Sequence, residues 1–178
     1  LWNLEKSVLQ RDIRRNAYSL IREITPSNGS RNITNLNQLS PWVQIWDVLY
    51  FWWLNWSNVT LNLSSNFTGR KTILIEWWNL FIRSNTLANN LSQDILWIVV
   101  LKDEQWRGWY IFIDRWVTEI NAILYADKAI ASSDTTRITQ TDDLNKILSP
   151  ENFWTYDYLN TQLYIYGSVF SNNTIWWS

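Results

Sequence analysis

Residues 95–113, ILWIVVLKDEQWRGWYIFI, are the stretch on which the predicted fold depends. The segments 95–101 and 106–113 are rich in β-branched and aromatic side chains, which favour strands. The polar KDEQ segment at 102–105 is typical of a turn. The pattern therefore predicts a β-hairpin over about 95–113, at the centre of an antiparallel sheet.

Helical patterns are expected on both sides of this hairpin. Apolar residues recur at helical spacing over about 3–24, which predicts an N-terminal amphipathic helix. A second helix is predicted over 41–56 after a Ser-Pro start, and a third over about 114–131. With a strand at 162–170, this order predicts an α+β fold: an antiparallel sheet with the central hairpin, packed by the N-terminal helix and by the helix at about 114–131.

The chain is expected to form one globular domain over residues 1–178, because 178 residues bury a substantial core and no Gly/Pro-rich linker divides them. No repeat of fixed period is evident. The Asn/Ser/Thr-rich stretch at about 57–70 is predicted to be a polar loop or a short edge strand. The segment 72–82 fits a strand or a helix, with a strand favoured at its start.

Composition excludes several classes of protein. The chain has no Cys, His or Met, which excludes a disulfide scaffold, a Cys/His zinc site and catalysis by Cys or His. No cofactor or metal ligand set is predicted. The net charge of −1 argues against a nucleic-acid partner, for which the basic N-terminal helix is the one favourable feature.

Catalysis by a pair of carboxylates is the enzymatic mechanism that this composition still allows. Glu76 lies beside Trp77 and Trp78 in an apolar run, and Asp47 lies on the expected Trp-rich helix. Glycosidases use two carboxylates, and sugars stack on tryptophan faces. A carbohydrate-binding module or a glycosidase is therefore an alternative function. The other interpretation of Glu76 is a strand residue that faces water, or a paired buried acid.

Fifteen tryptophans in one chain are more than a core of this size usually takes. Two explanations stand side by side: tryptophan replaces scarce Phe and absent Met in the core, or some rings anchor a neighbouring molecule. The candidate interface residues are Trp42, Trp46, Trp53, Trp56, Trp77 and Trp78.

These features favour a non-enzymatic structural or interaction subunit of a larger assembly, with other protein subunits as its partners. The expected order of elements is loosely similar to small connector proteins of phage tails and necks, at the level of fold alone. The run at 41–56 is too short and too polar to span a bilayer. Contact with a membrane through it, as an accessory scaffold subunit of a membrane-associated complex, is a further alternative.

Asn-X-Ser/Thr sequons are more frequent than composition alone predicts, and four of them gather in one stretch. The candidate glycosylation sites are Asn55, Asn58, Asn62 and Asn66. A secreted or virion-surface glycoprotein would carry glycans there. An unmodified Asn/Ser/Thr-rich loop is favoured, because the pattern is short and permissive. A virion or another multi-subunit complex is the favoured location, and an extracellular one if the sequons are used.

Overall fold

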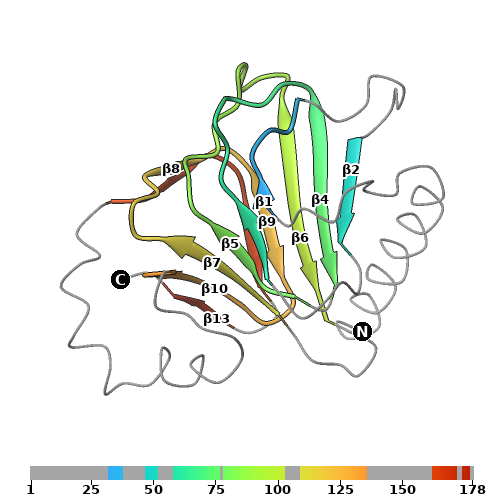
Figure 1. The fold of residues 1–178 in the computed structure, drawn as a ribbon. Coiled ribbons are helices and arrows are strands. Elements are labelled where there is room, and N and C mark those ends of the chain that lie inside the picture. Colours follow the sequence, from blue (N-terminus) through green and yellow to red (C-terminus); the bar gives the residue numbers. More distant parts are fainter. Residues whose placement is uncertain are drawn as a thin grey trace, which may run out of the picture.

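The computed structural model describes residues 32–37, 47–51, 58–76, 78–102, 109–135, 162–171 and 174–176. These ranges contain strands and turns but no helix, and all their strand pairs are parallel. The chain winds round a common axis, so that each turn adds one strand to each sheet (Figure 1). This arrangement is a parallel β-solenoid.

Two large sheets form the sides of the solenoid. The five-stranded sheet has the order β12-β9-β6-β4-β2. Its strands are β2 (Asp47–Phe51), β4 (Arg70–Glu76), β6 (Ile95–Leu101), β9 (Ile123–Ala126) and β12 (Val169–Ser171).

The six-stranded sheet has the order β1-β3-β5-β7-β10-β13. Its strands are β1 (Asn32–Ile33), β3 (Val59–Leu61), β5 (Leu80–Ile82), β7 (Tyr110–Asp114), β10 (Ala129–Ser133) and β13 (Thr174–Trp176). A small third sheet pairs β8 (Glu119–Ile120) with β11 (Tyr164–Ile165), and an isolated bridge links Thr86 to Ile120.

The core lies inside the turns, where one row of aliphatic side chains from each sheet meets the other. In the five-stranded sheet, Ile73, Ile98 and Leu124 occupy equivalent positions on successive strands and are fully buried. In the six-stranded sheet, Leu80, Ile111 and Ile130 occupy equivalent positions and are fully buried as well. A parallel strand buried on both faces is apolar at nearly every position, which accounts for the near-continuous apolar runs of β6 and β7.

Like residues stack where the chain passes from the five-stranded to the six-stranded sheet. The Asn79 side chain donates to Asn58 Oδ1 at 3.2 Å and accepts from the Tyr110 N–H at 3.0 Å. Trp78 stacks on Trp109 with ring centroids 6.1 Å apart. Side chains at successive corners of the solenoid thus contact one another, in addition to the backbone pairing of the strands.

The predicted α+β fold with an antiparallel sheet is wrong. Strands do form at 95–101 and 110–114, but they belong to different sheets and each pairs with strands from neighbouring turns of the solenoid. The apolar pattern indicated strands correctly. It carried no information on their partners, because a turn between two strands serves a solenoid corner as well as a hairpin.

The helix predicted at about 114–131 is also wrong, since β8, β9 and β10 occupy this stretch. Val117, Ile120 and Leu124 lie three to four residues apart and are all buried in the core. Their spacing arises because short strands separated by bends each direct one or two side chains inward, which imitates a helical period.

In the segment 41–56, residues 47–51 form strand β2 rather than helix, paired with β4. The strand expected at the start of 72–82 is confirmed by β4. The segment 162–170 holds two short strands joined by a bend instead of one strand. The N-terminal helix at 3–24 lies outside the described residues.

The lengths of the turns explain why no fixed repeat is evident in the sequence. Tyr110 pairs with Ala129, 19 residues later, whereas Leu80 pairs with Ile111, 31 residues later. Loops of different length between short strands conceal the period from which a solenoid is normally recognised.

Candidate functional site

The final turn, defined as residues 162–171 and 174–176, is the last turn of the solenoid that the structure describes. Among the described strands, β11, β12 and β13 each pair on one side only, with β8, β9 and β10. Leu163, Ile165 and Val169 pack against the core but are only half-buried. Tyr164, Tyr166 and Phe170 are 51%, 54% and 53% exposed. The last described turn therefore has partly exposed aliphatic side chains toward the core and exposed aromatic side chains on its outer faces.

Backbone hydrogen bonds hold the final turn onto the preceding one. The amides of Tyr164 and Tyr166 donate to Thr118 O at 2.9 Å and to Ile120 O at 2.8 Å. At the next corner, Gly167 lies against the backbone of Ala122, where an added Cβ would meet the Ala122 oxygen at 2.0 Å. Glycine is required here because the two segments of the chain approach each other too closely for any side chain.

A second surface lies on the outer face of the five-stranded sheet. Since Ile98, Leu124 and Val169 face the core, their neighbours Trp97, Tyr125 and Phe170 face outward. We call these three the outer aromatic row; within it, Trp97 pairs with Ile123 and therefore lies diagonal to Tyr125. Trp97 is 40% exposed, and the half-buried Tyr125 donates its hydroxyl to Asp127 at 2.7 Å. Tyr125 and Phe170 are direct neighbours across β9 and β12.

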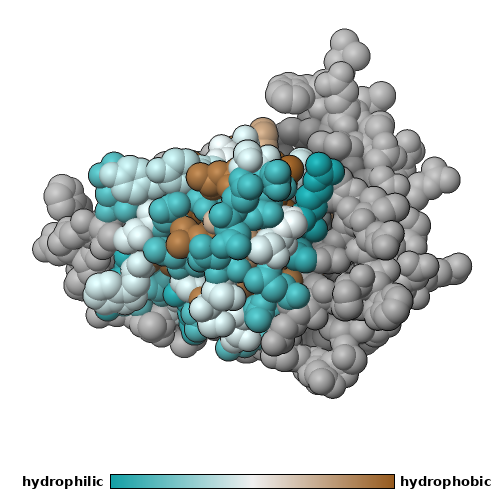
Figure 2. All heavy atoms as spheres, turned by 90° about the horizontal axis from the view of Figure 1, so that it is seen from above, coloured by the Kyte–Doolittle hydropathy of each residue, from teal (hydrophilic) through white to brown (hydrophobic). Residues whose placement is uncertain are grey.

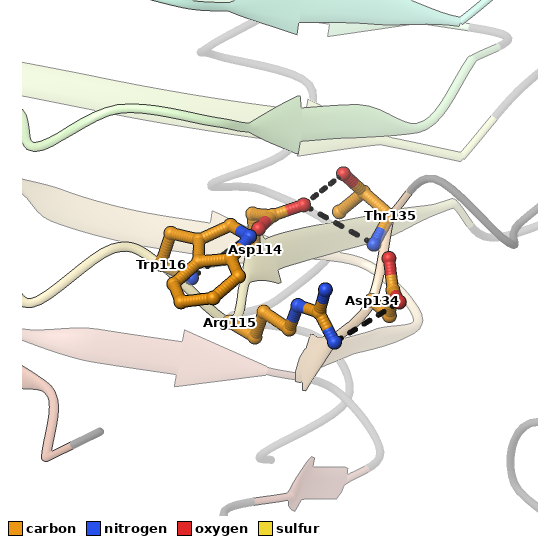
Figure 3. A network of polar contacts seen from close by, with 5 residues as sticks. All are labelled: Asp114, Arg115, Trp116, Asp134 and Thr135. Atoms are coloured by element: carbon orange, nitrogen blue, oxygen red, sulfur yellow. Dashed lines mark hydrogen bonds and ion pairs between the residues drawn. The ribbon is translucent and has the colours of Figure 1, made fainter. Parts of the chain in front are cut away.

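A polar network closes the carboxyl ends of β7 and β10 (Figure 3). Asp114 is buried and accepts from the Trp116 and Thr135 amides at 3.2 Å each, and also from the Thr135 hydroxyl. Arg115 forms an ion pair with Asp134 at 3.5 Å, and its guanidinium lies over the Trp116 ring at 4.6 Å.

The network includes one more cation. Arg83 donates to the Thr135 hydroxyl at 3.0 Å and to the Thr135 carbonyl at 3.2 Å. Arg83 is thus linked to Asp114 through the Thr135 hydroxyl, and both oxygens of Asp114 accept hydrogen bonds. Such an arrangement fixes the segment that follows β10 against β7, which is a structural role.

Glu76, the candidate catalytic acid, is buried at the end of β4. Asp47, its candidate partner, begins β2 and pairs with Lys71. Five residues of strand separate Lys71 from Glu76, which is roughly 16 Å. The register therefore does not bring these two residues together at one end of the sheet. Within the described ranges, no cluster of acidic side chains able to hold a metal ion occurs.

Of the predicted tryptophan anchors, only Trp78 falls within the described ranges. It is half-buried and stacks on Trp109, so it contributes to the solenoid corner. The remaining candidates lie outside the described residues: Trp42, Trp46, Trp53, Trp56 and Trp77. Sequence reasoning missed the outer aromatic row and the final turn, because only knowledge of the fold separates inward from outward residues.

The candidate glycosylation sites differ in their surroundings. Asn62 and Asn66 are exposed, whereas the half-buried Asn58 accepts from Asn79, and Asn55 lies outside the described ranges. Seen from above, the surface of the described residues is mostly hydrophilic with isolated apolar residues (Figure 2). Glycosylation stays a prediction, and Asn62 and Asn66 are the better acceptors on grounds of exposure.

The described ranges contain no helical segment with the length and apolar character needed to cross a membrane. No protein-family model matches this chain, and neither a curated protein nor a solved structure similar to it is found. The phage-connector likeness rested on an order of helices and a hairpin, and that order is absent from the described part of the chain.

Proposed function

We propose that this chain is a non-enzymatic structural subunit of a larger protein assembly and that it docks onto a neighbouring protein through the final turn. The observation that supports this proposal is the open core: Leu163, Ile165 and Val169 are only half-buried, although they pack against the hydrophobic cluster. A solenoid needs a cover at each end, because its terminal turns otherwise expose apolar surface.

Strand edges also support a protein partner. Unpaired N–H and C=O groups at an edge are a template for another strand, and β-strand addition is a common mode of protein recognition. Among the described strands, β11, β12 and β13 each pair with another strand on one side. A partner that adds strands there would bury the half-exposed aliphatic side chains and satisfy the backbone groups in one step.

The test compares the size of the native complex with and without an intact final turn. A tagged chain is expressed in the cells that make it, and extracts are analysed by size-exclusion chromatography with light scattering. We expect wild type to elute well above the 21.4 kDa of one chain. A Tyr164→Lys/Tyr166→Lys variant should elute as the free chain, because buried charge at an apolar joint is costly.

The matched control places the same two charges elsewhere. Leu91 and Trp116 are 62% and 70% exposed and lie outside the final turn, so a Leu91→Lys/Trp116→Lys variant should stay in the complex. Circular dichroism and thermal unfolding of both purified variants establish that each is folded. Wild type that elutes as a free chain in the extract, or a final-turn variant that stays in the complex, would overturn the proposal.

Carbohydrate binding is the second candidate function, and the outer aromatic row favours it. Tyr125 and Phe170 are direct neighbours and Trp97 lies diagonal to Tyr125 on the same sheet face, and aromatic rings grouped in this way can form a platform on which sugar faces stack. Calorimetric titration with a panel of soluble oligosaccharides tests this candidate. Binding should be lost in Trp97→Ala and kept in Trp116→Ala, which removes an exposed ring outside the row. A panel without any binding removes this candidate.

A further inference from the structure

We infer that Asn90, in the turn that precedes β6, carries an N-linked glycan. Asn90, Leu91 and Ser92 form an Asn-X-Ser sequon, one of eight in the chain. All three residues lie on the surface, with Leu91 62% exposed. This inference does not depend on docking through the final turn, because it concerns a different corner of the solenoid.

The middle residue of the sequon distinguishes Asn90 from the other sequons of the described ranges. In each of those sequons the residue between Asn and Ser/Thr is buried in the hydrophobic core: Ile33, Val59, Leu63 and Phe67. A transferase that binds three successive residues would have to pull such a side chain out of the core, which is costly. At Asn90 it can bind the whole sequon of the folded chain.

The two polar side chains of the Asn90 sequon also contact each other. Asn90 Oδ1 accepts hydrogen bonds from the Ser92 amide at 3.0 Å and from the Ser92 hydroxyl at 2.7 Å. This is an Asx turn, in which an asparagine side chain bonds to the backbone two residues later. The amide and the hydroxyl that define a sequon are therefore presented side by side on one exposed turn.

Two other exposed sequons lack this contact. The Ser64 hydroxyl, which belongs to the Asn62 sequon, donates to Thr34 O at 3.1 Å. The Thr68 hydroxyl, which belongs to the Asn66 sequon, donates to Asn37 Oδ1 at 3.1 Å. In both cases the hydroxyl holds a neighbouring segment of the chain. Exposure alone therefore does not separate these asparagines from Asn90, and the hydroxyl contact does.

The nitrogen of the Asn90 side chain is available for modification. No described residue accepts a hydrogen bond from Asn90 Nδ2, whereas Oδ1 is held by Ser92. A sugar in place of one hydrogen on Nδ2 therefore breaks no contact among the described residues. Because Oδ1 faces its own turn, Nδ2 is the end of the amide group that remains for a glycan.

Asp94 holds the backbone of this turn in place. Its Oδ2 accepts from the Asn90 N–H at 2.7 Å, and its Oδ1 accepts from the Gly69 N–H at 2.6 Å. The Asn90 carbonyl accepts from the amides of Gln93 and Asp94 at 3.1 and 2.8 Å. None of these bonds uses the side-chain amide of Asn90, so the turn keeps its shape with a glycan attached.

The modification is a glycosyl transfer from a sugar diphosphate donor, catalysed by a transferase of the cell. Asn90 Nδ2 forms a bond to the anomeric carbon of the sugar, and the bond between that carbon and the diphosphate oxygen breaks. The diphosphate leaves with the electron pair of the broken bond, and one amide proton passes to a base of the transferase. Hydrogen bonds to Oδ1 favour the deprotonated amide, so the contacts with Ser92 assist this step.

Tryptic digestion isolates Asn90 for the test. Cleavage after Arg83 and Lys102 gives a peptide of residues 84–102, in which Asn90 is the one sequon. The chain is purified from the cells that make it and treated with peptide-N-glycosidase in heavy-oxygen water, which converts a glycosylated asparagine into a labelled aspartate. We expect this label at Asn90 of wild type. A wild-type peptide without it would overturn the inference, whatever residues 32–70 carry.

Four variants test the role of each group, with the mass of the undigested glycosylated chain as the readout. Asn90→Asp keeps the Oδ1 acceptor but removes Nδ2, and Ser92→Ala removes the hydroxyl, so both should lose the glycan on peptide 84–102 completely. Ser92→Thr keeps the hydroxyl and should keep the glycan. Asn89→Gln, the matched control, changes an exposed neighbour outside any sequon and should keep it too.

Circular dichroism and thermal unfolding establish that each variant is folded. A folded Asn90→Asp or Ser92→Ala chain that still carries a glycan on peptide 84–102 would overturn the inference, and so would loss of the glycan in a folded Asn89→Gln chain.

Discussion

The two ends of the solenoid are built from the same kind of strand and differ in what happens to their core. At the first described end, Phe51 is 5% exposed and Leu49 is half-buried. At the last end, the inward residues Ile165 and Val169 are half-buried. Strand pairing alone thus leaves a solenoid core open, and each end needs a cover of its own.

The largest expected effect is on the free energy of unfolding, when a core side chain is shortened at each of the two ends. Phe51→Ala removes a buried ring and leaves a cavity, which should lower the free energy of unfolding by about 4 kcal/mol. Val169→Ala removes less from a half-buried site and should cost about 1 kcal/mol. Urea unfolding, performed in the Tyr164→Lys/Tyr166→Lys background so that association does not contribute, measures both. Equal costs would contradict the contrast between the ends.

A second prediction concerns how the last turn is attached. Gly167→Ala places a Cβ 2.0 Å from the Ala122 oxygen, a backbone atom that cannot give way, and we expect a loss of about 3 kcal/mol. Hydrogen exchange of amides 163–171 should accelerate, while β6 stays protected. Gly69→Ala is the control: its φ of 76° costs about 1 kcal/mol, but nothing lies within 4 Å of the new Cβ. Equal effects of the two substitutions would show that no close approach exists at Gly167.

Strands β4, β6 and β7 could be predicted from the sequence, whereas β2 and β8–β10 were predicted to be helical, and the partners of the strands could not be predicted. The run ILWIVVL at 95–101 forms β6 as expected, because β-branched residues buried on both faces show a local pattern. Pairing in a solenoid links residues such as Leu80 and Ile111, which are 31 positions apart, and the next pair in the same sheet has a different separation. No local signal encodes such distances.

The candidate surfaces were hidden for the same reason. Trp97 and Ile98 are adjacent and both apolar, but Ile98 faces the core and Trp97 is exposed. Only the strand register assigns each to its face. The tryptophan surplus drew attention to aromatic residues. The rings found at the open surfaces are, however, Trp97, Tyr164, Tyr166 and Phe170, none of which was predicted to be an anchor.

Phe170→Ala is expected to give the smallest change in stability, and it tests the contrast between the two ends. Phe170→Ala removes a ring that is 53% exposed, so the free energy of unfolding of the monomer should change by less than about 0.5 kcal/mol. Phe170 lies in the final turn, so its loss should weaken docking onto the neighbouring protein. The share of the chain that elutes in the large complex should therefore fall, which size-exclusion chromatography of cell extracts measures.

This pair of measurements, urea unfolding of the purified chain and size-exclusion chromatography of cell extracts, separates a residue kept for folding from one kept for association. Phe51→Ala should show the reverse balance, with a large loss of stability. While it remains folded it should elute in the large complex like wild type, since Phe51 lies in β2, at the opposite edge of the five-stranded sheet from β12. A Phe170→Ala chain that loses monomer stability as Phe51→Ala does would mean that the last turn is covered like the first, and the distinction between the ends would disappear.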